Sequence, residues 1–301
     1  MLLDEPTAFV PGWMPELAAA ANEQYLASGH RYTALDFADD RPLPAGFSLS
    51  QFRLWPFNQG PVGTCWENCT TQLFQIHTEA DGTYESVPLS RCMVGYQGKK
   101  LDGGGNPADG GSVLNGMLAM SDPPKGVGVC HESLWPYKPD RRYFAAGPPE
   151  GAIADANLNR VHNVARVEPM PEAIKRPIFN GHPVAIGISW PGNWDSCDTA
   201  GRVPSPGWPV GGHAITIIGW LDGWDGHNYY QVENSHGAIY HPLPPEIAAR
   251  VTGYKPAFPD KTHDAWYRED WLMRKLQDAE VLTAAGLTGF KKRLLNWTEV
   301  M

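Results

Sequence analysis

Apolar residues recur at helical spacing in a segment that starts at Cys65. Trp66, Cys69, Leu73 and Ile76 lie three or four residues apart, so they share one face of a helix running to about residue 80. Three further segments predict helices: "PELAAAANEQYLASG" (15–29), "PLSRCMVGYQ" (88–97) and "SVLNGMLAM" (112–120). The first half of the chain is therefore expected to be mainly helical.

The second half changes to runs rich in β-branched and aromatic residues, separated by Gly, Pro and Asp. Strands are predicted at "PVAIGISW" (183–190), "HAITIIGWL" (213–221) and "NYYQVEN" (228–234). The end of the chain, "DAEVLTAAGLTGFKKRLLNW" (278–297), predicts one or two surface helices. Helices followed by strands favour an α+β protein of two lobes, with a cleft between them.

These patterns divide the chain into three parts. Residues 1–42 form an N-terminal arm with one helix, residues 43–275 the main two-lobe domain, and residues 276–301 a C-terminal helical extension. The N-terminal sequence has acidic residues where a secretory signal would be basic, and no apolar run reaches the roughly 18 residues of a membrane span. A cytoplasmic protein, or one associated with a virion, is expected, with no membrane partner.

Composition excludes some partners and cofactors. The net charge is −9, and the densest basic run is the short "FKKR" at 290–293, so a nucleic-acid partner is disfavoured. Five cysteines cannot all pair, which indicates free thiols in a reducing setting. Their spacing does not fit a structural zinc site, and the loop "LDGGGNPADGGS" lacks the GK[ST] of a phosphate-binding loop. No metal and no organic cofactor is expected.

Cys65 stands where a thiol can become a nucleophile. The start of a helix favours an anion, and a histidine partner would stabilise the thiolate further. Gln59 lies six residues earlier, behind Gly60 and Gly63, which permit sharp turns. The loop can therefore bring the Gln59 amide and the Cys65 backbone N–H to one point, as an oxyanion hole requires. Taken alone, a cysteine at a helix start is more often a packing residue.

A histidine and an asparagine that could complete the set lie far downstream. His213 follows two glycines at the start of an apolar strand, so its ring would project from the strand end into the cleft. Asn234 ends the next strand, where its side chain can hold one imidazole nitrogen and direct the other toward sulfur. Taken alone, His213 would more often be a core histidine and Asn234 a turn residue. Together with Cys65 they supply a nucleophile, a base and a group that orients the base.

The motifs around these residues resemble those of papain-family cysteine peptidases. The matching segments are "QGPVGTCW", "GGHAITIIGW" and "VENSHG", with weaker similarity in "DGGS" (109–112), "GVCHESLWPY" (128–137) and "PVAIGISW". In order, they cover about Leu43 to Trp271. The resemblance implies a papain-like two-lobe fold with a helical N-terminal lobe and an antiparallel sheet or barrel in the C-terminal lobe. It also implies a thiol endopeptidase that forms an acyl-enzyme on peptide or protein substrates.

Carried over residue by residue, the resemblance gives each candidate a role. Cys65 would be the nucleophile, His213 the general base and then acid, Asn234 the orienting residue and Gln59 an oxyanion donor. The residues that would contact the substrate are Gly110, Gly111, Gly212, Ala214 and His236.

Several departures from the family pattern leave alternatives open. His236 replaces the tryptophan that usually shields the His–Asn hydrogen bond, and Val62 replaces a cysteine that is disulfide-bonded in secreted relatives, which fits a bacterial or phage-type member. The alternatives are a weakly active or inactive assembly component, for example of a phage particle with a protein partner, and a cell-wall peptide amidase. The arm is shorter than the family's propeptides, which favours a structural clasp over a segment that blocks the site.

Overall fold

Helices dominate the first half of the chain, as the sequence predicts. The computed structural model describes residues 10–28, 41–53, 56–82 and 88–287, with the backbone only at 161–163 and 281–287. The helices before residue 159 are α1 (Pro15–Ala27), α2 (Cys65–Asp81), α3 (Arg91–Leu101), α4 (Val113–Ala119), α5 (Arg141–Ala145) and α6 (Ala152–Ala156), with short 3₁₀ turns η1 (Ser50–Phe52) and η2 (Pro107–Asp109). The predicted helices at 15–29, 65–80, 88–97 and 112–120 are confirmed within a few residues at their ends.

An antiparallel sheet forms the second half. Its strands are β1 (Gly46–Ser48), β2 (Asn159–Arg166), β3 (Val184–Pro191), β4 (Pro209–Trp224), β5 (His227–Glu233), β6 (Asp264–Arg268) and β7 (Leu276–Leu287). They pair in the order β2-β7-β3-β4-β5-β6, and β1 joins the edge of β4. Helices α7 (Pro171–Phe179), α8 (Pro245–Ala248) and α9 (Glu269–Lys275) and the turn η3 (Gly192–Asp195) complete this half. The three predicted strands are confirmed as β3, β4 and β5.

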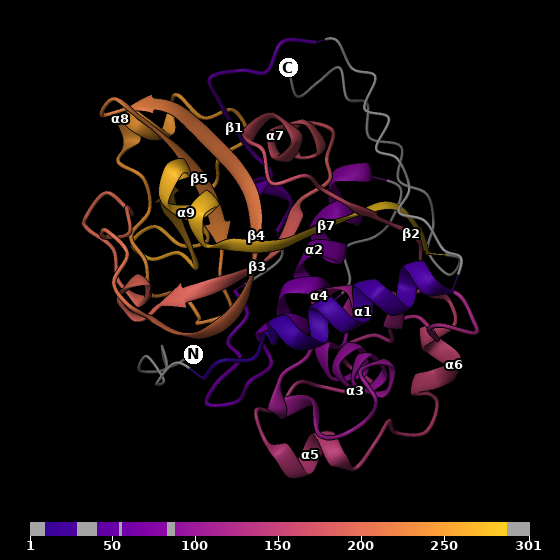
Figure 1. Cartoon of the computed structure of the whole chain (residues 1–301). Helices are drawn as coiled ribbons and strands as arrows, with labels where there is room; N and C mark the ends of the chain where they lie inside the picture. Colours follow the sequence, from indigo (N-terminus) through magenta and orange to yellow (C-terminus); the bar gives the residue numbers. More distant parts are fainter. Residues whose placement is uncertain (1–9, 29–40, 54–55, 83–87, 288–301) are drawn as a thin grey trace.

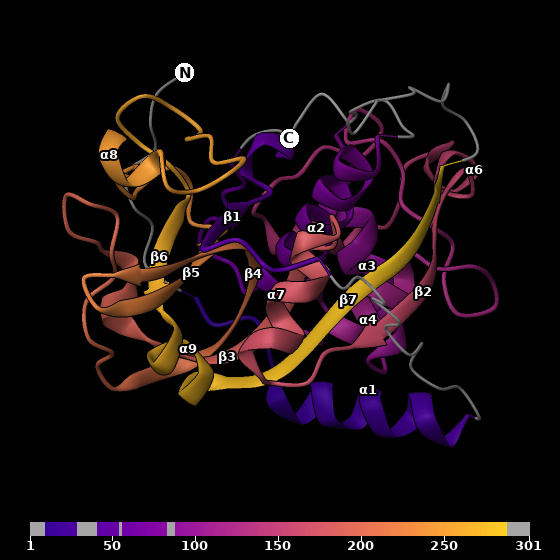
Figure 2. The ribbon, with the colours of Figure 1, turned by 90° about the horizontal axis from the view of Figure 1, so that it is seen from above.

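The predicted C-terminal helix is wrong over the residues that the structure describes. Residues 276–287 form strand β7, which lies between β2 and β3 and runs from α9 toward α6 (Figure 2). The segment is rich in alanine and leucine, which favour helices, but its backbone groups pair with strands on both sides, and such tertiary pairing overrides intrinsic propensity. This part of the expected extension therefore belongs to the sheet. Residues 288–301, with the basic run at 290–293, lie outside the described residues.

The two halves have separate apolar cores that meet at α2 and β3. One cluster contains buried residues of the helices, among them Trp66, Leu73 and Leu114, and the other contains the isoleucines of β3 and β4. Ala185 and Ala214 lie on strands but belong to the helical cluster. The face of β3 and β4 that carries these two alanines is therefore turned toward α2. Figure 1 shows α2 beside these strands.

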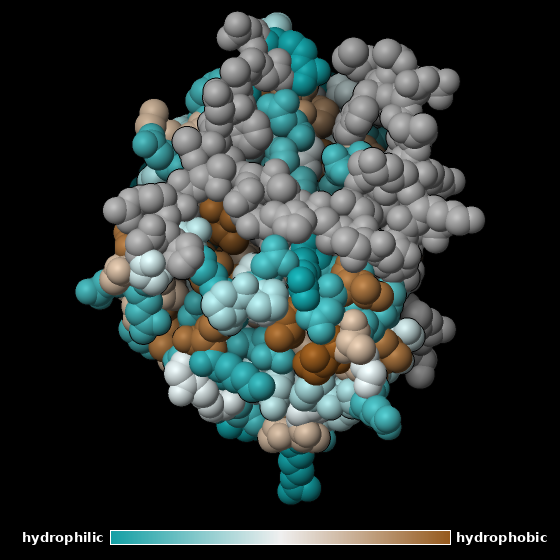
Figure 3. Space-filling model, turned by 90° about the vertical axis from the view of Figure 1, so that its right-hand side faces the viewer, coloured by the Kyte–Doolittle hydropathy of each residue, from teal (hydrophilic) through white to brown (hydrophobic). Residues whose placement is uncertain are grey.

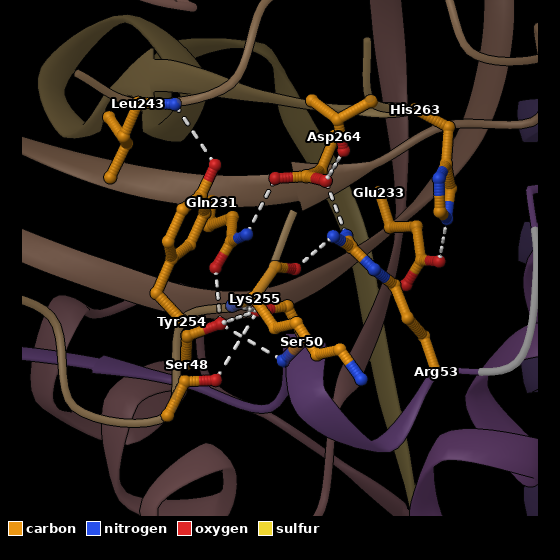
Figure 4. Close-up of polar contacts among 12 residues, drawn as sticks. Ser48, Ser50, Arg53, Gln231, Glu233, Leu243, Tyr254, Lys255, His263 and Asp264 are labelled. Atoms are coloured by element: carbon orange, nitrogen blue, oxygen red, sulfur yellow. Dashed lines mark hydrogen bonds and ion pairs between the residues drawn. The ribbon is translucent and has the colours of Figure 1, made fainter. Parts of the chain in front are cut away.

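A buried polar network fixes the end of the sheet where β5 and β6 pair. The side chain of Asp264 meets the Arg53 guanidinium and accepts from Gln231 Nε2 at 2.6 Å, and His263 pairs with Glu233 (Figure 4). Buried charges are stabilised only when they are paired in this way. On the opposite side of the molecule, outside the grey atoms of Figure 3, apolar residues lie interspersed among polar ones.

Candidate active site

Cys65 is the first residue of α2, and its thiol is completely buried. Thr64 precedes the helix, and the turn before it contains Gly60 in the left-handed region at φ +64°. The sulfur accepts a hydrogen bond from the backbone N–H of Ala214 on β4 at 3.4 Å. Residues 65 and 214 are 149 positions apart in the sequence. The start of α2 is therefore in direct contact with β4 at the residue that follows His213.

His213 and Asn234 lie side by side on neighbouring strands. His213 lies on β4, and Asn234 follows the last residue of β5; His213 Nε2 is 2.8 Å from Asn234 Oδ1. The backbone N–H of Ser235 also donates to Oδ1, at 2.8 Å, so this atom must be the amide oxygen. Because an amide oxygen only accepts, Nε2 carries the hydrogen of the imidazole. Asn234 Nδ2 donates to Tyr240 Oη at 2.9 Å, which holds the amide in this orientation.

Two aromatic rings enclose the imidazole of His213. The centroid of the Trp190 indole lies 4.5 Å from that of the imidazole, with an interplanar angle of 64°. The ring of His236 stacks on the same imidazole, with a centroid distance of 4.8 Å and an interplanar angle of 29°. His236 Nδ1 is 2.8 Å from a carboxylate oxygen of Asp195. Burial lowers the pKa of His213 well below its ordinary value, and the neighbouring His236 lowers it further, while the bond to Asn234 acts in the opposite direction. His213 is therefore neutral in this arrangement.

Gln59 lies at the same place, held by the turn after Asn234. Its backbone N–H donates to the Ser235 carbonyl at 2.7 Å, and its Oε1 accepts from Ser235 Oγ at 2.7 Å. Its Nε2 donates to the carbonyls of Val62 at 2.8 Å and Val10 at 3.3 Å. The structure therefore brings one segment, with Gln59 and Cys65, against the two neighbouring strand segments that carry His213 and Asn234.

The N-terminal arm lies across these residues. Gly111 N–H donates to the Gly12 carbonyl at 2.8 Å, Met14 N–H donates to the Gly111 carbonyl at 3.2 Å, and Gly12 N–H donates to the Gly212 carbonyl at 3.3 Å. Trp13 thus forms a parallel bridge with Gly111, and only 2% of its surface is exposed. From Pro15 the chain continues as α1, which runs alongside α4 (Figures 1 and 2). The segment from Gly12 to Met14 therefore pairs with the backbone on both sides of Cys65, at Gly111 and at Gly212.

Burial under the arm changes the chemistry of the sulfur. It raises the pKa of the Cys65 thiol to about 12, although hydrogen bonds from the backbones of Ala214 and Gly12 act in the opposite direction. The sequence predicts a thiolate paired with a histidine, but the covered thiol and His213 are both neutral at neutral pH. The reason is that burial disfavours the charged form of each group.

The predicted substrate-contacting residues all lie at this site. Gly111 and Gly212 bond the arm, the Ala214 N–H bonds the sulfur, and His236 covers the imidazole. Gly110 also faces the arm, because a Cβ on it would lie 2.6 Å from the Gly12 carbonyl oxygen.

The sequence did not predict that Trp13, Asp195 and Ser235 would lie at the site. Trp13 and Asp195 carry no sequence signal, because only the fold brings them here. Ser235 stands next to Asn234 in the quoted motif, so its role could have been inferred.

The other four cysteines form no disulfide. All five thiols are free, and Cys69, Cys92 and Cys130 are buried. In residues 10–28, 41–53, 56–82 and 88–287, no cluster of three His, Cys, Asp or Glu side chains could hold a metal ion. No helix within these same ranges combines the length and apolar character needed to cross a membrane.

Solved structures show the same arrangement of helices and sheet. No protein-family model matches the chain, and no curated protein matches it significantly. Xylellain, a cysteine protease from Xylella fastidiosa, is 19% identical with a TM-score of 0.68, over 94% of this chain and 99% of that one. Procathepsin L 3 of Tenebrio molitor larval midgut is 15% identical with a TM-score of 0.60, over 87% and 79%. The cysteine protease and lectin-like domains of Cwp84 from Clostridium difficile are 14% identical with a TM-score of 0.62, over 95% and 63%. The chain therefore has the papain-like α+β fold of these cysteine proteases.

Proposed function

We propose that the chain is a cysteine-type peptidase whose reactive sulfur belongs to Cys65. One observation carries this proposal: the start of α2 meets β4 so that Cys65 Sγ contacts the residue next to His213, whose Nε2 is held by Asn234. A nucleophile, a base and a group that orients the base are the parts that acyl transfer requires. The papain-like fold of solved cysteine proteases supports the same assignment.

The proposed reaction proceeds through an acyl-enzyme. The Cys65 thiolate attacks a peptide carbonyl, and the oxyanion accepts from Gln59 Nε2 and from the Cys65 backbone N–H, which is outside the helical hydrogen-bond ladder. Because Asn234 engages Nε2, Nδ1 of His213 is the atom that takes the thiol proton and passes it to the leaving amine. Water, deprotonated by His213, then releases the acid and restores the thiol.

The same proposal makes the arm a blocking segment. Gly111 and Gly212 are the backbone groups that would pair with a substrate, and the arm already uses them. Departure of the arm lets water reach Cys65 and His213 and removes the desolvation that keeps both neutral. Two of the similar structures are of precursor forms, procathepsin L 3 and the ragweed allergen Amb a 11 in its proform, which fits a covered site.

Removing the arm tests the proposal. Deletion of residues 1–14 removes the contacts that Val10 to Met14 make with the site and leaves α1, which begins at Pro15. Iodoacetamide at about pH 6, followed by mass spectrometry, should label Cys65 in this variant much faster than the other four cysteines, and the variant should hydrolyse casein. The matched control is deletion of residues 1–9, which retains the contacts of Val10 to Met14 and should label slowly. Cys65→Ala in the 1–14 deletion should abolish hydrolysis.

Other outcomes would favour the alternatives. Slow, uniform labelling without hydrolysis after the deletion would contradict the peptidase and favour an assembly component. Hydrolysis of peptidoglycan peptides without hydrolysis of casein would favour a cell-wall peptide amidase.

A further inference from the structure

Two charged side chains bind the backbone on either side of Gly111, the glycine that pairs with the arm. Lys99 lies in the last turn of α3, and Asp102 is the residue that ends this helix. Lys99 Nζ donates to the Gly110 carbonyl at 2.6 Å. The backbone N–H of Ser112 donates to Asp102 Oδ2 at 3.3 Å. A cation and an anion therefore hold the two peptide groups that flank Gly111.

The bond from Lys99 determines where the Gly111 N–H points. In a planar trans peptide group the C=O and the N–H point in opposite directions, and the peptide groups on both sides of Gly111 are trans. The Gly110 carbonyl is turned toward Lys99, inside the helical half. The Gly111 N–H of the same peptide group consequently points into the cleft, where it donates to the Gly12 carbonyl at 2.8 Å.

The bond to Asp102 acts on the next peptide group in the same way. Because the Ser112 N–H is turned toward this carboxylate, the Gly111 carbonyl of the same peptide group points in the opposite direction. There it accepts from the Met14 N–H at 3.2 Å. Both backbone groups that Gly111 presents to the cleft are thus fixed from the helical side.

The signs of the two charges suit the groups that they bind. An ammonium at a carbonyl oxygen polarises the peptide group and makes its N–H a stronger donor. A carboxylate at an N–H makes the carbonyl of that peptide group a stronger acceptor. Gly111 therefore offers a strengthened donor and a strengthened acceptor to a chain that lies in the cleft.

Both charges are removed from most of the solvent. Lys99 is 7% exposed, and a Cβ on Gly105 would lie only 3.4 Å from its Cε, so the loop after α3 covers it. Asp102 is half-buried and also accepts from Asn115 Nδ2 at 2.7 Å. Burial raises the pKa of Asp102, whereas the bond from Asn115 and the charge of Lys99 lower it. Because a buried ammonium is costly unless it is paired, the bond to Gly110 is part of what keeps Lys99 inside.

We propose that Lys99 and Asp102 are positioning residues, which hold Gly111 in the orientation that pairs with an extended peptide in the cleft. In the full chain this peptide is the arm. In the chain without the arm it is a substrate, and for the substrate the inference rests on the proposed function. Both residues act through the backbone of Gly111 and not on the reacting atoms.

Hydrogen exchange in the full chain tests the role of Lys99 without any assay of catalysis. Lys99→Met keeps an unbranched side chain of similar length but removes the charge and the donor. We expect the Gly111 N–H to exchange about tenfold faster, because its peptide group loses a charge-assisted hydrogen bond. Lys100→Met, at the exposed next residue of α3, is the matched control and should leave the rate unchanged. An unchanged rate in Lys99→Met, or equal acceleration throughout the β3–β4 pairing, would overturn the inference.

A second variant addresses the other charge and also serves if the lysine variant does not fold. Asp102→Asn puts an amide NH2 against donors that now bind both carboxylate oxygens, the Ser112 N–H among them. The Met14 N–H, which donates to the Gly111 carbonyl, should then exchange about tenfold faster. Asp81→Asn, at the exposed last residue of α2, is the control. Unchanged protection of the Met14 N–H in Asp102→Asn would contradict the role of the carboxylate.

Steady-state kinetics separate this inference from the proposed function. In the chain lacking residues 1–14, Lys99→Met and Asp102→Asn should each raise KM for a peptide substrate about tenfold and change kcat far less. The reason is that backbone pairing is made by the bound substrate and the transition state alike. A fall in kcat at unchanged KM, or no change in either, would overturn the inference and leave the peptidase intact. Absence of any cleavage before these substitutions would contradict the peptidase, and the exchange measurements on the full chain would still decide the role of the two residues.

Discussion

At the scale of single residues, burial and the neighbouring side chains of His236 and Asn234 determine the charge of His213. His236 stacks on His213 and pairs with Asp195, where the family pattern has a tryptophan. The stack preserves the shielding of the His213–Asn234 bond, while a second imidazole makes protonation of His213 less favourable. The substitution therefore keeps the packing and alters the electrostatics.

Replacing His236 by phenylalanine should separate these two effects. His236→Phe keeps an aromatic ring against His213 but removes a group that can carry positive charge. Because His236 lowers the pKa of His213, we expect the alkaline limb of the kcat/KM profile, measured on the chain lacking residues 1–14, to move to higher pH. His241→Phe, at a half-buried histidine without a ring contact to His213, is the control. An unchanged limb in His236→Phe would contradict the electrostatic role.

Glu67 is a second residue whose surroundings decide its charge. It lies in the first turn of α2, is fully buried and faces Gly95 of α3, and its oxygens accept no hydrogen bond within the described chain. Burial raises its pKa well above the ordinary value, even though Arg91 acts in the opposite direction. The folded chain retains this proton, whereas the unfolded chain releases it above about pH 4.3.

The stability that Glu67 contributes should therefore fall as pH rises above about 4.3. Glu67→Gln cannot ionise, so we expect it to raise the free energy of unfolding by about 1–2 kcal/mol at about pH 8, with little gain at about pH 4. Denaturant unfolding at the two pH values measures this difference. Glu16→Gln, at an exposed position of α1, should show no such dependence; a gain in Glu67→Gln that is equal at both pH values would refute the explanation.

At the scale of elements, local sequence patterns predict most of the helices and strands that build the site. The periodicity after Cys65 predicts α2, and the apolar runs at 183–190, 213–221 and 228–234 predict β3, β4 and β5. These hydrophobic patterns are local in the sequence, and so are the motifs that identify Cys65, His213 and Asn234 as candidates. Their proposed roles stay predictions, while the fold that brings them together is confirmed.

Non-local contacts account for what the sequence does not predict. Strand β7 has helix-favouring residues, and only its two partner strands make it extended. The path of the arm depends on Gly111 and Gly212, which are about 100 and 200 positions from Trp13. Asp278 and Glu280 lie in the segment that the sequence assigns to a surface helix, so their burial in the sheet opposite β3 could not be foreseen.

A single methyl group on β3 should displace the arm. Gly187→Ala would place a Cβ 2.2 Å from Trp13 Cε2, and such overpacking costs about 1–3 kcal/mol. We expect Cys65 in this variant to react with iodoacetamide about 5- to 150-fold faster than in the parent chain. The same substitution in the chain lacking residues 1–14 is the control and should leave the rate unchanged. A slow reaction in Gly187→Ala would show that the indole does not hold the arm.

At the scale of the whole molecule, the arm joins the two halves. It bonds Gly111, which lies between η2 and α4, and Gly212, which lies on β4. The helical core and the sheet core meet beneath it at α2 and β3. The arm therefore adds to the backbone pairing across this boundary, which the Gln59 N–H also makes with the Ser235 carbonyl.

Hydrogen exchange should report this pairing. The Gly111 N–H donates to the Gly12 carbonyl, so its exchange should accelerate when residues 1–14 are deleted. Amides in the β3–β4 pairing, such as those around Ile217, do not depend on the arm and should keep their protection. Faster exchange throughout the sheet would instead indicate that the deletion loosens the entire fold.

Because the arm is part of the same chain, its hold on the cleft does not depend on how much protein is present. A segment tethered by a short connection acts at an effective concentration on the order of millimolar, so a free peptide of equal intrinsic affinity must reach that level to compete. Cutting the chain between the cleft and α1 would abolish this advantage in one irreversible event. A bound segment would then become an ordinary ligand, which dilution alone removes.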